Sequence, residues 1–121
     1  AIERQHLKTT EIIRRDEDVL VPSIAIAEYL VGLHLSANPR ERELITRNIE
    51  ALERSSTILE FGEKEAKAFA ILQSEAFKSG RGRSDFDLAI AAHAVVEDAI
   101  LVTRDKNARL SELTGVVTRE V

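Results

Sequence analysis

The chain has 121 residues, of which 44% are hydrophobic and 31% charged, and its formal net charge at pH 7 is -4. This length supports one domain with its own core, and the composition argues against a disordered chain. No apolar run approaches the ~18 residues that a membrane-spanning helix needs, which argues against a membrane protein. Because the chain lacks cysteine, disulfides and thiolate metal sites are excluded, and a cytoplasmic location is expected. The acidic balance argues against a broad basic surface, so any nucleic-acid contact should be local.

The first half of the chain predicts one buried strand among helices. The strand is a short, mostly β-branched run that ends at Pro22, and Ser23 is expected to cap the helix that follows. A break at Asn38 and Pro39 separates this helix from a charged one. The expected elements, in chain order, are a helix over residues 1–16, a strand over 19–21, a helix from Ser23 and a helix over 40–54.

The second half of the chain alternates strands with helices. A loop with two glycines and two arginines, residues 79–83, separates a long amphipathic helix from a segment too apolar to lie on the surface. Ser84 and Asp87 have the spacing of a capping box at the start of that segment, and Asp85 lies in the same turn. The expected elements are a strand over 57–61, helices over 63–78 and 84–96, a strand over 99–102, a short helix over 108–113 and a strand over 116–118.

Three of these helices have a predicted inner face. The positions predicted to face the core are Ile24, Ala27, Val31 and Leu35 in the helix from Ser23, Leu44, Ile45, Ile49 and Leu52 in the helix over 40–54, and Ala66, Ala70, Ile71 and Phe77 in the helix over 63–78. Glu28 falls on the first of these stripes, with no Lys or Arg within one turn. If its carboxylate is buried, it needs a hydrogen-bonding or charged partner, or its pKa is raised. Alternatively, Glu28 lies at the edge of the apolar stripe and its side chain reaches solvent.

Apolar strands that alternate with helices predict a three-layer α/β/α fold with a central, mostly parallel sheet, in one domain over residues 1–121. In such sheets ligands bind beyond the carboxyl ends of the strands. Glu28 and Asp105 each follow a strand, and Asp87 opens a helix that must run alongside, so three carboxylates are expected to meet at one edge. Oxygen ligands without cysteine suit Mg²⁺ or Mn²⁺, which serve phosphate chemistry.

These residues resemble the motifs of a known family. The motif segments are Ile26–Gly32 (IAEYLVG), Asp87–Ala94 (DLAIAAHA) and Leu101–Asp105 (LVTRD). In this order and spacing they are similar to the PIN-domain nucleases, specifically the VapC-type toxins of toxin–antitoxin pairs. The resemblance implies a Mg²⁺- or Mn²⁺-dependent endoribonuclease, a small antitoxin partner and a homodimer. It also implies that Glu28, Asp87 and Asp105 are the catalytic, metal-holding acids and that Asp85 is an auxiliary ligand.

One part of the family pattern has no match in the sequence. Such domains carry a first acid at the end of a central first strand, and nothing near Ala1 corresponds to it. The chain as written is therefore expected to lack its N-terminal strand, which would lie between the strands at Leu20–Val21 and Ile100–Val102. Residues upstream of Ala1 or a strand of another chain are expected to fill that position. Otherwise the backbone N–H and C=O groups along both flanking strands would be buried without hydrogen-bond partners, which costs too much free energy.

Several candidate residues have a structural alternative. The basic residues that flank the acids, and are candidates for contacts with RNA phosphates, are Arg81, Arg83, Arg104 and Lys106. A solvated loop explains them nearly as well. His93 is expected to be a packed, hydrogen-bonded core residue and not a metal ligand. The Ser84–Asp87 pair by itself fits a helix cap with no catalytic role.

Two other classes of function compete with the nuclease. One is a non-catalytic PIN-like module that binds a protein partner, which metal-dependent cleavage of RNA would distinguish. The other is a receiver-like phosphoacceptor domain, which also gathers acids around Mg²⁺ at strand ends. That class requires an acid pair directly after the first strand, whereas Val21 is followed by Pro22 and Ser23.

Overall fold

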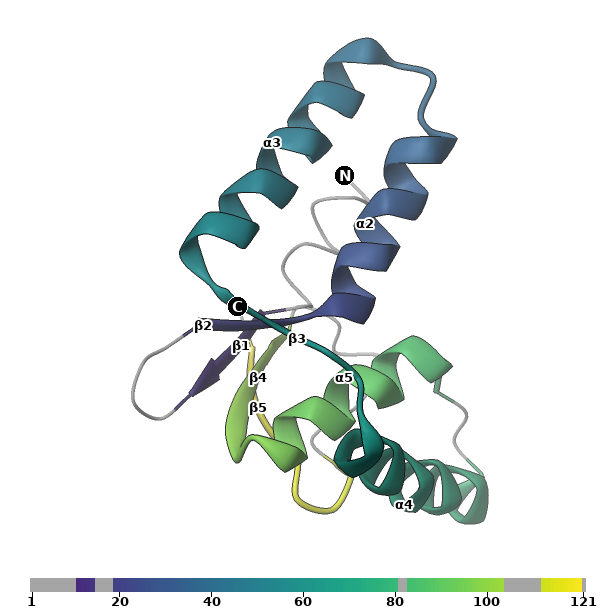
Figure 1. Cartoon of the computed structure of the whole chain (residues 1–121). Coiled ribbons are helices and arrows are strands. Elements are labelled where there is room, and N and C mark those ends of the chain that lie inside the picture. The colour runs from purple at the N-terminus through teal and green to yellow at the C-terminus, as the bar shows by residue number, and fades with distance from the viewer. Residues whose placement is uncertain (1–10, 15–18, 81–82, 104–111, 121) are drawn as a thin grey trace.

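The computed structural model describes residues 11–14, 19–80, 83–103 and 112–120, which form a five-stranded sheet with helices on either side (Figure 1). The strands are β1 (Glu11–Arg14), β2 (Val19–Pro22), β3 (Thr57–Leu59), β4 (Ala99–Thr103) and β5 (Val117–Glu120). The helices are α2 (Ser23–Leu35), α3 (Pro39–Ser55), α4 (Glu63–Ser79) and α5 (Asp85–Val96). None of these helices is both long and apolar enough to cross a membrane.

Four strands of the sheet run in one direction. The spatial order is β3-β2-β1-β4-β5, and β1 is antiparallel to both of its neighbours, so β2 and β4 are parallel to each other. The outer strands β3 and β5 are parallel to β2 and β4, respectively. The predicted mostly parallel sheet is therefore confirmed, and its one reversed strand is the central one.

The strand β1 occupies the central position that residues upstream of Ala1 or a strand of another chain were expected to fill, so that expectation is wrong in this structure. Ile12 lies opposite Leu20 on one side and Leu101 on the other, so one short segment pairs with both ladders. The helix predicted over residues 1–16 is wrong at Glu11–Arg14, and the rest of it lies outside the described residues. Ile12 and Ile13 are consecutive β-branched residues, which favour a strand. The unpaired backbone groups that β2 and β4 would otherwise have are a stronger constraint than the loose helical pattern over residues 1–16.

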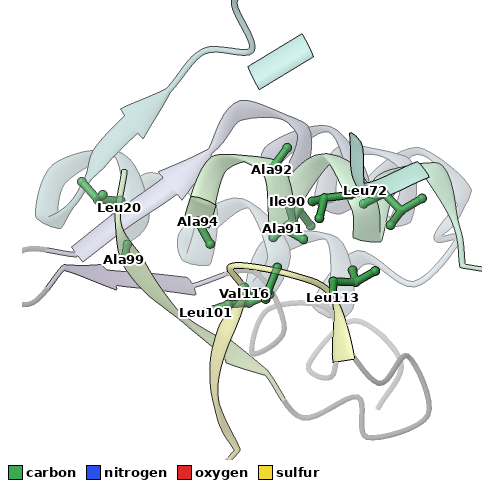
Figure 2. Close-up of a cluster of buried hydrophobic side chains, with 11 residues drawn as sticks. Leu20, Leu72, Ile90, Ala91, Ala92, Ala94, Ala99, Leu101, Leu113 and Val116 are labelled. Atoms are coloured by element: carbon green, nitrogen blue, oxygen red, sulfur yellow. The ribbon is translucent and has the colours of Figure 1, made fainter. Parts of the chain in front are cut away.

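Both faces of the sheet are covered. Leu20 and Leu101 are 2% and 0% exposed, and the neighbouring Val21 and Val102, which point to the opposite face, are 0% and 4% exposed. Figure 2 shows Leu101 and Val116 facing Ala91 and Ile90 of α5, in a cluster that also includes Leu72 of α4. In the view of Figure 1, α4 and α5 lie below the sheet and α2 and α3 extend above it, which gives the predicted three-layer α/β/α arrangement.

Local signals define most of the helix ends. The side chain of Asn38 accepts hydrogen bonds from the backbone N–H groups of Arg40 (2.9 Å) and Glu41 (3.4 Å), which starts α3. Gly80, with a φ of 70°, ends α4 in the left-handed conformation. The prediction that Ser23 caps α2 is wrong, because Ser23 is the first helical residue and Pro22, which has no capping side chain, occupies the N-cap position.

The inner faces of α2 and α4 differ from those predicted. In α2, Ala25 and Tyr29 are buried, whereas Val31 and Leu35 are 53% and 80% exposed. In α4, Leu72 and Ala76 are buried, whereas the predicted core residues Ile71 and Phe77 are 63% and 77% exposed. Both helices have apolar residues on more than one side, so periodicity alone could not select the buried one.

The central position of β1 predicts a high cost for a proline there. A proline at Ile13 removes a backbone N–H from a strand with neighbours on both sides, so Ile13→Pro should lower the free energy of unfolding by about 3 kcal/mol or more. Urea denaturation measures this change. The matched control is Ala37→Pro in the exposed turn before α3, and equal stability of the two variants would place the segment outside the sheet.

Candidate active site

The first turn of α5 holds two of the candidate acids. The hydroxyl of Ser84 accepts a hydrogen bond from the backbone N–H of Asp87 (3.1 Å), so the predicted cap is present. The side chain of Asp85 is exposed and accepts a hydrogen bond from Nε2 of Gln73 on α4 (3.0 Å). The side chain of Asp87 is only partly exposed. This turn therefore presents carboxylates at the end of a helix whose next seven residues, 88–94, are all buried.

The topology brings this turn to the carboxyl edge of the sheet. Only Glu97 and Asp98 separate α5 from β4, so the helix and the strand run in opposite directions and contact each other. With 12 residues, α5 is about 18 Å long, and β4, with 5 residues, is about 16 Å long. The N-terminus of α5 therefore lies near the carboxyl end of β4.

Glu28 belongs to the same edge. Its helix, α2, begins at Ser23 directly after β2, whose carboxyl end points the same way as that of β4. The helix also packs against α5. Glu28 is partly exposed. Its burial is therefore intermediate between the two alternatives from the sequence, a buried carboxylate and one exposed to solvent.

The other candidate residues divide into two groups. Arg81, Arg104, Asp105 and Lys106 lie outside the described residues. Arg83 is described, and its side chain is only 4% exposed, because its guanidinium pairs with Glu112 (Nη2 to Oε1, 3.2 Å). The described residues thus include two of the three proposed metal ligands, Glu28 and Asp87, and no cluster of three or more His, Cys, Asp or Glu occurs among them.

Two contacts near the site had no signal in the sequence. Oε1 of Glu75 on α4 accepts hydrogen bonds from both the backbone N–H and the hydroxyl of Thr114 (3.1 Å each). Gln73, on the same helix, contacts Asp85. These partners lie 39 and 12 positions apart, and only the packing of α4 along α5 reveals them.

The PIN domain model matches residues 2–114, which is most of the chain. The chain belongs to the PIN domain family. The resemblance to this family, which the motifs of α2 and α5 predict, is confirmed. A comparison with curated protein sequences found no match for this PIN domain.

Solved structures similar to this PIN domain come from VapBC complexes. VapBC-5 from Mycobacterium tuberculosis, a member of the VapBC family of toxin–antitoxin systems, is 27% identical, with a TM-score of 0.74 and coverage of 83% of this chain and 79% of that one. VapBC-1 from nontypeable Haemophilus influenzae is 26% identical, with a TM-score of 0.70 and coverage of 84% and 72%. VapBC2 from Rickettsia felis, bound to a promoter DNA fragment, is 24% identical, with a TM-score of 0.74 and coverage of 84% and 74%.

His93 of this PIN domain is a core residue outside the acidic edge. It is 1% exposed and lies edge-on to Phe61, with ring centroids 5.7 Å apart. Its predicted packing is confirmed, but the predicted hydrogen bonding is wrong at Nε2, which has no hydrogen-bond partner among the described residues. Burial lowers the pKa of His93 below its usual 6.5, and the carboxylates of Glu65 and Glu97 offset only part of this effect.

The lowered pKa of His93 predicts a loss of stability in mild acid. Above pH 6.5 the imidazole is neutral in both the folded and the unfolded chain, and as the pH falls below 6.5 the unfolded chain takes up the proton first. The free energy of unfolding should therefore decrease between pH 7 and pH 5. The variant His93→Leu should lose less stability over this range in urea denaturation. The control is His34→Asn on the exposed end of α2, and parallel curves for wild type and His93→Leu would contradict the assignment.

Proposed function

We propose that this PIN domain is the nuclease toxin of a toxin–antitoxin pair and that it hydrolyses phosphodiester bonds within RNA in the cytoplasm, with a divalent metal ion. The family match and the similarity to VapBC-5 and VapBC-1 support a nuclease toxin in general terms. The observation that supports this proposal most is topological: α2 and α5 both begin at the carboxyl edge of β2 and β4. Glu28 and Asp87 belong to these two segments.

The donor atoms available at this edge fit a hard cation. We assign Glu28, Asp87 and Asp105 as catalytic residues that hold Mg²⁺ or Mn²⁺, with Asp85 as an auxiliary acid. Carboxylate oxygens are the ligands these ions prefer, and the chain has no cysteine that would favour a softer metal. When bound, the ion supplies Lewis-acid polarisation of the phosphate and a more acidic water.

The protein residues have distinct roles in this proposal. The cap at Ser84 fixes the backbone that carries Asp87, and Gln73 orients Asp85. Arg81, Arg104 and Lys106 are assigned to the RNA phosphates, because they adjoin the acids in sequence and cations of this kind position a phosphate backbone. Arg83 was also predicted to contact RNA, but its side chain is buried and its guanidinium pairs with Glu112.

The variant Asp87→Asn tests the catalytic assignment. It should reduce cleavage of single-stranded RNA in the presence of Mg²⁺ or Mn²⁺ by about 100-fold or more, since even the residues that support metal ligands contribute 10–100-fold. Its thermal stability should be equal or higher, because the backbone N–H that Ser84 caps is retained and repulsion among the acids is reduced. A gel assay of labelled RNA and a thermal melt measure the two effects.

Asp98→Asn is the matched control. Asp98 is an exposed acid at the other end of α5 with a φ of 49°, a conformation that asparagine tolerates, so the same change of charge should leave cleavage unaffected. Loss of folding in Asp87→Asn would instead support a purely capping role. Failure of the wild type to cleave RNA with either metal would favour the alternative, a non-catalytic PIN-like module that binds a protein partner.

An exposed apolar stripe on α2 supports the antitoxin partner. Val31 and Leu35 are one turn apart and 53% and 80% exposed, and Glu28 precedes Val31 by three residues on the same side of the helix. Exposed apolar side chains beside a functional site are typical of a protein-binding surface. We propose that the antitoxin docks on this stripe next to the acidic edge. The homodimer is also proposed, and light scattering in solution tests it.

The double variant Val31→Ser/Leu35→Ser should weaken antitoxin binding by at least about 10-fold without a change in fold, since each side chain buries apolar area only in the complex. The partner for calorimetry is the product of a short reading frame that adjoins the gene. Ile71→Ser, an exposed apolar residue on α4, is the control. Unchanged affinity of the double variant would place the antitoxin elsewhere.

A further inference from the structure

Arg83 differs from an RNA-binding arginine in its burial. It directly precedes Ser84, the N-cap of α5, and its side chain is 4% exposed. Its guanidinium lies 3.2 Å from Oε1 of Glu112, a residue whose side chain is 46% exposed. An arginine that binds phosphate must present its N–H groups to solvent. The donors of Arg83 face the protein instead.

The ion pair is one of two links that hold the segment Glu112–Thr114. Thr114, two residues after Glu112, donates two hydrogen bonds to Glu75 on α4, and Leu113 between them is buried. Glu75, Arg83, Glu112 and Leu113, together with Ser79, line a pocket of about 370 Å³. The segment Glu112–Thr114 is thus fixed on one side to α4 and on the other to the residue that precedes α5.

A buried guanidinium that loses a carboxylate partner is strongly unfavourable, so the pair with Glu112 contributes to fixing where the chain enters α5. The next residue, Ser84, caps the N–H of Asp87, so any shift of Arg83 passes to the first turn of α5 through the backbone. Catalysis is sensitive to such shifts, because a displacement of about 1 Å can reduce a rate by about 100-fold.

We infer that Arg83 is a positioning residue, whose ion pair with Glu112 orients the first turn of α5 and thereby the carboxylate of Asp87. This inference rests on the proposed nuclease function. It replaces a direct contact between Arg83 and RNA. The partly exposed Glu112, which lies outside the three motif segments, acquires a role in the reaction through Arg83.

The test compares Arg83→Met, Glu112→Gln and the double variant with the wild-type protein. Positioning predicts that each single variant lowers kcat for RNA cleavage by about 10–100-fold, with KM and its salt dependence unchanged. The double variant should be no worse than Arg83→Met alone, since both changes break one interaction. The affinity for Mn²⁺, measured by calorimetry without RNA, should fall in all three.

Arg47→Met is the matched control, because Arg47 also pairs with a glutamate, Glu43 at 2.7 Å, but on the exposed surface of α3. It should change none of these quantities. Should Arg83→Met fail to fold, Glu112→Gln carries the test, since its partly exposed side chain keeps its shape. The inference is overturned if Arg83→Met raises KM and reduces the slope of KM against salt concentration by the amount expected for the loss of about one phosphate contact, while Glu112→Gln has no effect. A wild-type protein that neither binds Mn²⁺ nor cleaves RNA refutes the proposed function itself.

Discussion

The burial of α5 is the constraint on which the other features of the structure depend. Seven consecutive residues of this helix are buried, between α4 and the sheet. A helix enclosed in this way has its direction set by β4, to which it is joined by a two-residue turn. Because the helix and the strand are of similar length, the only polar part of α5 that reaches solvent at the carboxyl edge is its first turn. That turn contains Asp85 and Asp87.

The sheet adds a second carboxylate to that edge for an independent reason. β2 and β4 are both paired with β1, which is antiparallel to each, so their carboxyl ends coincide. The helix that follows β2 must therefore begin beside the N-terminus of α5, and Glu28 lies on it. Neither acid needs the other for its placement. The common edge at which α2 and α5 begin follows from strand direction and helix length.

The contacts of α4 stabilise this arrangement from the side. Gln73 bonds to Asp85, Glu75 bonds to Thr114, and the guanidinium of Arg83 is enclosed where the loop after α4 meets Glu112. A polar network at the end of an apolar helix is costly unless its members are paired, because the local dielectric is low. In contrast, Nε2 of His93 in the apolar part of α5 has no hydrogen-bond partner within the part of the chain that the structure describes, and its burial favours the neutral imidazole.

The sequence by itself predicted the strands and helices that the structure describes from Val19 onward, together with the cap at Ser84, because these depend on local composition and on neighbours within one turn. The predicted helix over residues 108–113 lies largely outside the described residues, and the metal-holding role of the acids stays a prediction. Only the tertiary structure decided that Glu11–Arg14 is the central strand, since one of its two pairing partners, β4, is distant in sequence. It also decided which side of α2 and α4 is buried, because both helices are apolar on several sides. The same holds for Arg83, whose charge suggested solvent until the fold brought Glu112 to it from 29 residues away.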